Sequence, residues 1–544
     1  MPPQGPRAAA GHTPVVSERN RVPAGTGVRG GRFAAATHQE PDLQLPGEPE
    51  PGPEGTALRC GMCGQFRTRA SAHRCPAPGL VPLSAAAARV LEQCRAAGGR
   101  PLIVGGSVRD ALVAAQRGSI LVSKDVDIEV YDAEPAALAR ELAAVGRVDE
   151  VGVSFGVLKV VCGGEDFDVS LPRTDSKVGS GHRGFEVRVD HGLDEVAAFG
   201  RRDFTVNAMG WDPLTEELVD PYGGSADLEQ GVLRHTTDAF DEDPLRVLRG
   251  MQLAGRFELV FAPETAHRCQ SLVGAFGELP RDRVWGEWCK VARKAEHPSA
   301  SLRALHESGW EHHFVELADL RDVPQDPRWH PEGPVHVHTA LSADAAARAA
   351  TKAGLDEEER EVVVLAAMLH DLGKATHTHT EADGSITSRG HAAAGVDRAR
   401  RLLTRMGAPH RMHYLVGPLI AEHMTCAGTT EPTPAAVRRL TRRLSGPKGT
   451  GPTLSQWAAV VAADNAGRGT GSRPSPADAW VSVAASLGEG VAPRAGVLTG
   501  DHLIAAGMSP GPRFRPLLAA ALAAQDEGSF GDERGALAWL AAQD

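Results

Sequence analysis

The sequence lacks long apolar runs and a cysteine framework. None of its 544 residues belongs to a run of about 18 consecutive apolar residues, and the first 30 residues contain no apolar signal core. We therefore expect no membrane partner and a cytoplasmic protein. The eight cysteines are scattered along the chain, which fits a reducing compartment better than a disulfide scaffold.

The sequence also lacks an excess of positive charge. It contains 58 Lys and Arg residues and 69 Asp and Glu residues, which gives a formal net charge of −11. Basic residues gather locally at 398–405 and 438–443. These faces could follow a nucleic-acid backbone or could be solvated helix surface balanced by nearby acids, and both readings stay open.

Two aspartates one residue apart are the most informative feature. Asp125 and Asp127 stand in Ser-Lys-Asp-Val-Asp-Ile-Glu-Val, a strand-like stretch. Side chains at i and i+2 of a strand point to one face, about 7 Å apart. Such a pair suits divalent cations like Mg²⁺, which take oxygen ligands and assist nucleotidyl transfer. Asp168, in a later strand-like run, is a candidate third carboxylate.

A glycine pair supplies the complementary half. Residues 102–104 read as the end of an apolar strand, and Gly105 and Gly106 let the backbone approach a ligand before a helix opens at Ser107. A helix N-terminus binds phosphate. Arg109 lies one turn into this helix and is expected to reach a triphosphate oxygen.

Further motifs follow in order: Arg-Arg-Asp-Phe-Thr-Val-Asn at 201–207, Asp-Pro-Tyr-Gly-Gly at 220–224 and Glu-Asp-Pro-Leu-Arg-Val-Leu-Arg at 242–249. Together these motifs resemble class II members of the tRNA nucleotidyltransferase and poly(A) polymerase family. The stretch 173–185 occupies the place of the family's flexible loop but departs from it in sequence.

The resemblance implies roles for single residues. It assigns catalytic metal ligation to Asp125 and Asp127 and the phosphate loop to Gly105, Gly106 and Arg109. It further implies nucleotide contacts from Arg202, Asp203, Asn207, Asp243, Arg246 and Arg249. Among these, Asp203 and Asn207 match the ribose-reading positions. Asp243 and Arg246 match the protein template for the incoming base, and their i, i+3 spacing would put an acceptor and a forked donor on one helix face.

A second candidate metal site lies in the later half. His338, His370, Asp371 and Asp464 follow the order H…HD…D within apolar, helix-like flanks. Imidazole and carboxylate ligands from separate helices can hold a divalent transition metal that activates water. The pattern resembles the HD phosphohydrolase domain, in which His391 and His423 would be extra ligands or phosphate contacts.

A third candidate is zinc near the N-terminus, held by Cys60, Cys63, His73 and Cys75. Cysteine and histidine are the ligands of tetrahedral zinc. Only one residue separates His73 from Cys75, so a reduced, unstructured thiol cluster remains the alternative reading.

The predicted fold class is α+β, with a small mixed-sheet nucleotidyltransferase head followed by an all-α neck, an HD domain and a helical tail. Residues 1–56 contain 10 Pro and 9 Gly, which favours disorder. The expected boundaries are 1–57 for this extension, 58–80 for a possible zinc motif, 81–235 for the head, 236–325 for the neck, 326–470 for the HD domain and 471–544 for the tail.

The resulting hypothesis is an enzyme that extends RNA 3′ ends, most simply by adding CCA to tRNA from CTP and ATP. A poly(A) polymerase or an enzyme that adds only A uses the same head and is the nearest alternative. An alternative from another enzyme class is an HD phosphohydrolase whose head binds a ligand but does not catalyse a reaction. A third possibility is a zinc-tethered RNA-binding adaptor without catalysis.

Overall fold

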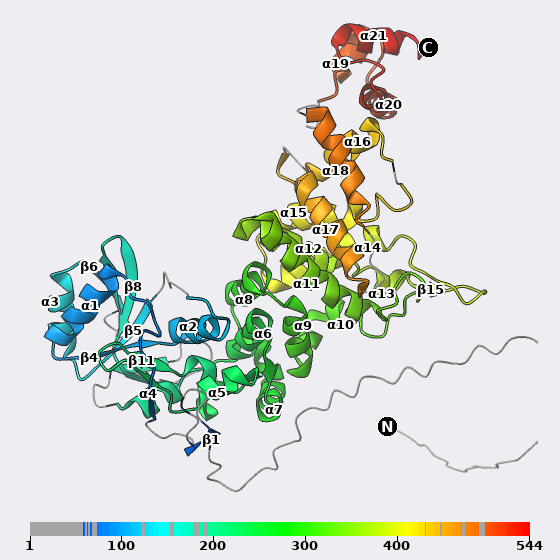
Figure 1. The fold of residues 1–544 in the computed structure, drawn as a ribbon. Coiled ribbons are helices and arrows are strands. Elements are labelled where there is room, and N and C mark those ends of the chain that lie inside the picture. The colour runs from blue at the N-terminus through cyan, green and yellow to red at the C-terminus, as the bar shows by residue number, and fades with distance from the viewer. Residues whose placement is uncertain are drawn as a thin grey trace, which may run out of the picture. The chain divides into compact units, whose positions relative to one another are not determined.

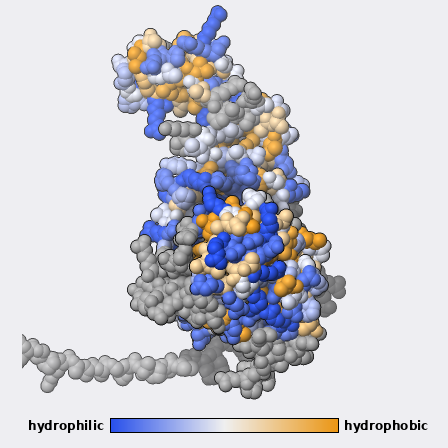
Figure 2. Space-filling model, turned by 90° about the vertical axis from the view of Figure 1, so that its left-hand side faces the viewer, coloured by the Kyte–Doolittle hydropathy of each residue, from blue (hydrophilic) through white to orange (hydrophobic). Residues whose placement is uncertain are grey.

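The computed structural model describes residues 58–59, 63, 66–67, 73–120, 126–152, 157–177, 185–189, 193–429, 431–446, 449–469, 474–488 and 495–543. Asp125 and Cys60 lie outside these residues. No helix among the described residues is both long and apolar enough to cross a membrane. On the side drawn in Figure 2, hydrophobic residues of the head lie interspersed with hydrophilic ones.

An eight-stranded mixed sheet forms the core of the head, in the order β3-β12-β11-β4-β5-β8-β7-β6. Its strands are β3 (Arg74–Pro76), β4 (Arg100–Val104), β5 (Val126–Tyr131), β6 (Arg147–Gly152), β7 (Val157–Cys162), β8 (Glu165–Ser170), β11 (Gly210–Asp212) and β12 (Glu217–Val219). Only β5 and β8 pair in parallel, and the other neighbours are antiparallel. The predicted mixed sheet is confirmed.

Alternation along β5 gives the sheet two different faces. Ile128 and Val130 point into the main hydrophobic core, whereas Tyr131 belongs to a smaller core on the other face. Helices α1 (Ala85–Ala96) and α3 (Pro135–Ala143) pack against each other and against sheet strands. Helix α4 (Glu195–Gly200) supplies Phe199 to the smaller core. Asp127, exposed between buried neighbours, shares the side of the sheet that Tyr131 faces.

Short elements complete the head. Helices α2 (Gly106–Gln116) and α5 (Gly224–Glu229) and the 3-10 helix η2 (Thr205–Asn207) carry the remaining motifs. Two-stranded pairs are formed by β1 (Leu58–Arg59) with β2 (Phe66–Arg67), by β9 (Arg173–Lys177) with β10 (Phe185–Val189), and by β13 (Val232–Leu233) with β14 (Val260–Phe261).

The chain after residue 237 is almost entirely helical, as predicted (Figure 1). It begins with η3 (Asp238–Glu242), α6 (Leu245–Phe257), α7 (Pro263–Ser271), η4 (Val273–Glu278), α8 (Arg281–Lys294), α9 (Pro298–Glu307), η5 (Trp310–Phe314) and α10 (Val315–Ala318). It continues with α11 (Val335–Ala353), α12 (Glu357–Leu369), α13 (Lys374–His377), β15 (His379–Thr380), β16 (Ile386–Thr387), α14 (His391–Met406), α15 (Arg411–Glu422), α16 (Pro434–Leu444) and α17 (Leu454–Ala466). It ends with α18 (Ala477–Leu487), α19 (Gly500–Ala505), α20 (Phe514–Asp526) and α21 (Glu533–Ala541).

Helix α12 is central to the second half. Its first turn is closed by a capping box between Asp356 and Glu359, and the run 362–369 is apolar and buried on every side. It packs against α8, α11, α15 and α17. Because the helix is enclosed, its C-terminal end delivers residues 370 and 371 into the protein interior.

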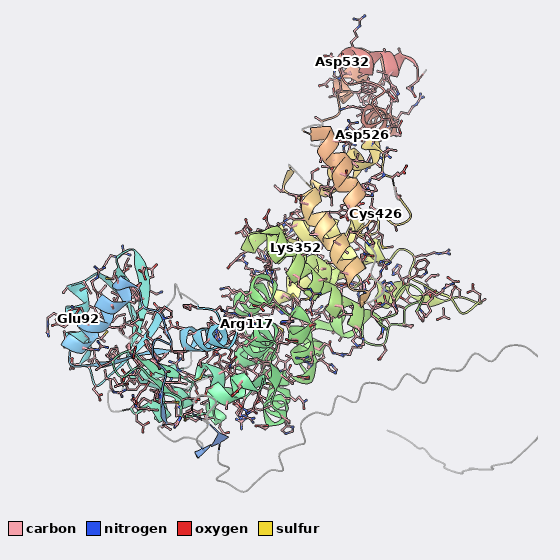
Figure 3. All side chains as sticks on the ribbon, in the orientation of Figure 1. Glu92, Arg117, Lys352, Cys426, Asp526 and Asp532 are labelled. Carbon is pink, nitrogen blue, oxygen red and sulfur yellow. The ribbon has the colours of Figure 1, made fainter. Side chains whose placement is uncertain are left out.

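Ion pairs join the successive parts. Arg256 of α6 contacts Asp110 of α2 at 2.7 Å, and Arg117, at the end of α2 in Figure 3, contacts Glu296 at 3.0 Å. Helices α19 to α21 have a small hydrophobic core of their own. The carboxylate of Asp526 in α20 accepts hydrogen bonds from both terminal nitrogens of Arg442 in α16.

Candidate functional site

The glycine loop has a backbone that only glycine tolerates easily. Gly105 has φ +70° and is followed directly by α2. A Cβ at this position would lie 2.8 Å from Nη1 of Arg202, so the missing side chain lets that guanidinium sit over the loop. The N-terminus of α2 and a cation thus meet at one point, which is an arrangement suited to phosphate.

Asp127 and Asp168 lie directly opposite each other in the parallel pair β5–β8. Side chains at matched positions of neighbouring strands point to the same face, and both are exposed. Lys159 of β7 contacts Asp168 at 3.4 Å. The structure therefore brings the predicted third carboxylate beside Asp127, and Asp125 precedes the first residue of β5 by one position.

A buried polar network ties α2 to η2 and α6. The Arg109 guanidinium donates to Asn207 Oδ1 and, at 2.7 Å, to Asp110 Oδ1. Asn207 donates to Asp203 at 2.9 Å, and Arg249 donates to the other oxygen of Asp203 at 2.7 Å. Burial raises the pKa of Asp203, but Arg249 and Asn207 outweigh it and hold the pKa at about 2. The carboxylate is therefore charged at neutral pH.

This network includes Arg109. Its side chain is only 6% exposed, and its guanidinium contacts Asp110 and Asn207. These contacts hold the first turn of α2 against η2. The predicted contact of Arg109 with a triphosphate oxygen stays a prediction.

Glu129 is a site residue that the sequence reasoning missed. It lies two positions after Asp127, on the same face of β5, and accepts from Arg202 Nη2 at 3.1 Å. Arg202 also donates to the main-chain carbonyl of Asn207 at 3.3 Å. Glu129 thereby fixes the arginine that covers Gly105, and the i, i+2 repeat after Asp127 was the available signal.

Contrary to the prediction, Asp243 and Arg246 do not share a helix face. Asp243 precedes α6 and has an extended backbone, because the residue before a proline avoids the helical region. Its carboxylate accepts from Arg283 of α8 at 2.8 Å. Arg246 donates to the carbonyls of Ala239 at 2.6 Å and Arg201 at 2.8 Å. Both residues therefore have intramolecular partners in this structure.

Six side chains carried by five helices converge in the second half. We name them the His–Asp centre; its members are His338 of α11, His370 and Asp371 after α12, His391 of α14, His423 after α15 and Asp464 of α17. All six are buried. The four residues predicted as ligands and the two predicted as extra contacts are thus brought together.

Asp371 links the two halves of the centre. One carboxylate oxygen lies 3.3 Å from His370 Nε2 and 3.8 Å from His338 Nε2, and the other lies 3.3 Å from His391 Nε2 and 3.9 Å from His423 Nε2. Asp464 approaches the first group, 3.0 Å from His338 Nε2. A carboxylate with imidazoles on both sides can bridge two cations.

Three histidine rings are oriented by contacts with nearby main-chain carbonyl groups. His370, His391 and His423 each have Nδ1 at 2.7 Å from the carbonyl oxygen three residues earlier. An imidazole that donates from Nδ1 presents Nε2 as a lone pair. The ring of His338 is oriented by Glu332 instead, whose carboxylate lies 2.7 Å from Nδ1. Glu332, within the Trp-His-Pro-Glu-Gly segment, was not predicted as part of the site.

The donor set fits a metal. Within the described residues, His370 Nε2 and both carboxylate oxygens of Asp371 are buried without a hydrogen bond of normal geometry, although Lys374 Nζ lies 2.6 Å from Asp371. Burial and the neighbouring His370 lower the pKa of His423 to about 4, which keeps it neutral. Neutral imidazole and carboxylate are the forms that bind divalent transition metals.

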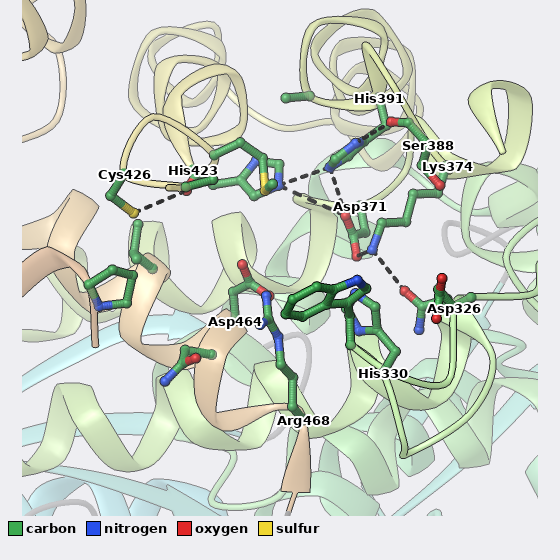
Figure 4. A pocket seen from close by; sticks show the side chains of 18 of the residues that line it. Asp326, His330, Asp371, Lys374, Ser388, His391, His423, Cys426, Asp464 and Arg468 are labelled. Atoms are coloured by element: carbon green, nitrogen blue, oxygen red, sulfur yellow. Dashed lines mark hydrogen bonds and ion pairs between the residues drawn. The ribbon is translucent and has the colours of Figure 1, made fainter. Parts of the chain in front are cut away.

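A cavity of about 790 Å³ opens onto the centre (Figure 4). Asp371, His391, His423 and Asp464 form one part of its wall. Cationic side chains also line it, namely Lys374, Arg389 and Arg468. The cavity therefore combines metal-binding groups with positive charge, which suits an anionic ligand.

Two other predictions concern sites outside these centres. Cys63, His73 and Cys75 have ligand atoms within 4.8 Å of one another, whereas Cys60 lies outside the described residues. The basic helix faces are largely engaged by acids. Arg398 pairs with Asp319 at 2.5 Å, and Arg443 pairs with Glu422 at 2.8 Å. These contacts favour balanced helix surface over a free backbone-binding face.

Comparison with known proteins identifies two family models in the chain. A poly A polymerase head domain matches residues 102–234, and an HD domain matches residues 335–448.

Curated relatives match over most of their length. A "Multifunctional CCA protein" of Xanthomonas campestris pv. campestris (strain B100) is 36% identical over 375 residues, which covers 67% of this chain and 85% of the relative. A protein of the same name from Stenotrophomonas maltophilia (strain R551-3) is 37% identical over 349 residues, covering 63% and 80%. Among solved structures, the Bacillus stearothermophilus CCA-adding enzyme in complex with CTP has a TM-score of 0.54 and 19% identity, covering 85% of this chain and 98% of that one. That likeness concerns the fold.

Proposed function

The chain belongs to the family of multifunctional CCA proteins and is a nucleotidyltransferase, and on that premise we propose that it adds C, C and A to the 3′ end of tRNA from CTP and ATP. The observation that carries the proposal is the alignment of Asp127 with Asp168 near the Gly105 turn. Ile103 of β4 lies opposite Ile128 of β5, so the chain reaches Gly105 level with the start of β5. The carboxylates and the start of α2 would then border the space that a nucleoside triphosphate enters.

The carboxylates of Asp127 and Asp168, together with Asp125, would hold Mg²⁺. When bound, the cation lowers the pKa of the 3′-hydroxyl and neutralises charge on the α-phosphate. The amides at the start of α2 and the guanidinium of Arg202 would bind the phosphate tail. Glu129 would keep Arg202 over the loop.

Base and ribose selection would use residues that now have internal partners. Asp203 and Asn207 would orient the ribose of the nucleotide through the buried network. Asp243 and Arg246 would present an acceptor and a donor to C and A. Their contacts to Arg283 and to main-chain carbonyls would then exchange when a nucleotide binds.

The decisive experiment offers purified protein a tRNA lacking its CCA end, with CTP and ATP supplied separately and together. We expect full CCA addition only with both. Incorporation of A alone, or long A tracts, would instead support the poly(A) polymerase or A-adding alternative. Asp127→Asn should reduce incorporation at least about a hundredfold, because a metal ligand is lost. Asp132→Asn, an exposed acid directly after the other end of β5, is the matched control.

A second activity is favoured by the His–Asp centre. We infer that the HD domain is a metal-dependent phosphohydrolase acting on phosphate groups of nucleotides or RNA ends. The donor set is suited to a divalent transition metal, which when bound would lower the pKa of a water molecule. Lys374, Arg389 and Arg468 would attract and orient the anionic substrate in the cavity.

The two activities can be separated by variants made in parallel. His370→Ala should abolish phosphate release and leave CCA addition intact, whereas Asp127→Asn should do the reverse. His410→Ala, at an exposed histidine before α15, is the control. Loss of all activity in His370→Ala alone would support the alternative in which hydrolysis is the main reaction. A protein that turns over no labelled nucleotide at all would support the RNA-binding adaptor.

A further inference from the structure

Lys159 continues the line of charged residues at the candidate nucleotidyltransferase site. In the register of the sheet, Lys159 of β7 lies opposite Asp168 of β8, and Asp168 lies opposite Asp127 of β5. Residues at matched positions of neighbouring strands point to one face of the sheet. Leu158 and Val160, on either side of Lys159, belong to the main hydrophobic core, so the lysine projects from the opposite face. The three charged side chains therefore stand in a row across three strands.

The order of the strands gives this row a direction. Strand β4, which leads into the Gly105 turn, pairs with β5 on the side away from β8, and β7 pairs with β8 on the side away from β5. The Gly105 turn and Arg202 thus lie at one end of the row, the two carboxylates in the middle and Lys159 at the other end. With neighbouring strands about 5 Å apart, Lys159 stands about 10 Å beyond β5.

In-line transfer requires the two substrates to meet the carboxylates from opposite sides. The attacking 3′-hydroxyl and the departing pyrophosphate lie on opposite sides of the α-phosphate. Because the pyrophosphate would be held at the Gly105 turn, the RNA acceptor would approach from the side of β8 and β7. We propose that Lys159 binds the phosphate group that joins the last two nucleotides of the acceptor RNA, an inference that rests on the proposed nucleotidyl transfer.

The ammonium group of Lys159 can exchange partners. It lies 3.4 Å from an oxygen of Asp168, which is longer than the roughly 2.7–2.9 Å of a charge-assisted hydrogen bond, and its side chain is 62% exposed. An exposed ion pair of this kind contributes little to stability. Since like charges repel, Lys159 would leave Asp168 when that carboxylate binds a divalent cation. The negatively charged RNA phosphate is then its new partner.

The proposal predicts a change in the affinity for RNA and not for the nucleotide. In Lys159→Met, the KM for tRNA lacking CCA should rise about three- to tenfold, whereas the KM for CTP should stay within about twofold. Lys159→Arg, which keeps the charge, should retain a nearly normal KM for tRNA. Arg140→Met is the matched control, because Arg140 is a 72% exposed cation of α3, which packs on the other face of the sheet. An unchanged KM for tRNA in Lys159→Met would overturn the proposal.

Binding without reaction supplies a second readout. With Mg²⁺ but without CTP, Lys159→Met should bind the same tRNA about three- to tenfold more weakly. The slope of log affinity against log salt concentration should become shallower by about 0.7–0.9, because one phosphate contact is lost. A merely structural effect of the substitution would not change this slope. An affinity and a slope equal to those of the unsubstituted protein would contradict the phosphate contact.

A neutral linkage identifies the phosphate. When the linkage between the last two nucleotides of the acceptor is replaced by an uncharged methylphosphonate, the unsubstituted protein should lose about as much affinity as Lys159→Met loses. Lys159→Met should show no further loss, because the two changes remove the same contact. If the unsubstituted protein adds no nucleotide to tRNA, the proposed function is refuted. Normal addition, together with equal losses in both proteins on the methylphosphonate, would refute only the role of Lys159.

Discussion

Replacing Asp203 with Asn should destabilise the head by a predictable amount. The Asp203 side chain is 5% exposed and accepts hydrogen bonds from the amide of Phe204 at 2.8 Å, from Asn207 and from Arg249. Asparagine keeps the shape but removes the charge and turns one acceptor into a donor. That donor would face a neighbouring donor in a buried position.

The magnitude follows from the pKa of this carboxyl. Its pKa falls from 3.8 to about 2, because Arg249 and Asn207 outweigh the effect of burial. The difference corresponds to about 2 kcal/mol in favour of the folded state. Since the folded pKa is the lower one, the stabilisation is present above the unfolded pKa and is lost as pH falls toward 2. About half of it should remain at about pH 3.

Scanning calorimetry of the full-length protein measures the effect, with hydrogen exchange in β4 and α2 identifying the transition of the head. A loss of about 2 kcal/mol should lower the melting temperature by about 4–8 °C at neutral pH, and by roughly half as much at about pH 3. Asp132→Asn, at a 68% exposed side chain, is the control. A melting temperature that does not change at neutral pH would refute the reasoning. So would a difference that is independent of pH.

Other substitutions probe packing at separate places. Gly224→Ala should disrupt the start of α5, because the new Cβ would lie 2.1 Å from the carbonyl oxygen of Thr205; loss of nucleotide addition together with a lower melting temperature is expected, and unchanged values would contradict the close packing. Glu361→Gln should weaken the contact between α12 and α8, because the carboxylate of Glu361 is 2% exposed and lies 2.5 Å from Arg293. We expect the free energy of unfolding in urea to fall by about 3 kcal/mol. A decrease below about 1 kcal/mol would argue against a buried ion pair. Trp457→Phe removes an indole N–H that donates to a main-chain carbonyl of α15 at 2.8 Å; about 1–2 kcal/mol should be lost without a change in CCA addition, and no measurable loss would show that water replaces the indole.

Local sequence patterns were sufficient for the fold class. The run 362–369 is apolar on every side, which is typical of an enclosed helix, and strand-like runs before residue 212 predicted the sheet. The adjacent pair His370 and Asp371 could be recognised because both ligands leave one helix end together. These features depend on neighbouring residues and can be read from short windows.

Long-range partners could not be read in this way. Asp243 meets Arg283, 40 residues later, and Glu129 meets Arg202, 73 residues later. Neither spacing carries a periodic signal. The burial of Arg109 was hidden for the same reason, because its partner Asn207 belongs to a distant motif. A sequence window indicates which groups are reactive, but the topology decides whether each one faces a ligand or its own protein.

In His370, His391 and His423, Nδ1 contacts the main-chain carbonyl three residues earlier. These contacts have a consequence for how the His–Asp centre responds to the loss of a ligand. Each ring is oriented at Nδ1 by a carbonyl of its own chain segment, so its orientation does not depend only on the Nε2 contacts within the centre. Loss of one ligand should therefore leave the remaining rings correctly directed. Metal affinity would then decline in graded steps as ligands are removed one by one, and an impaired centre could regain binding when an external imidazole fills the gap.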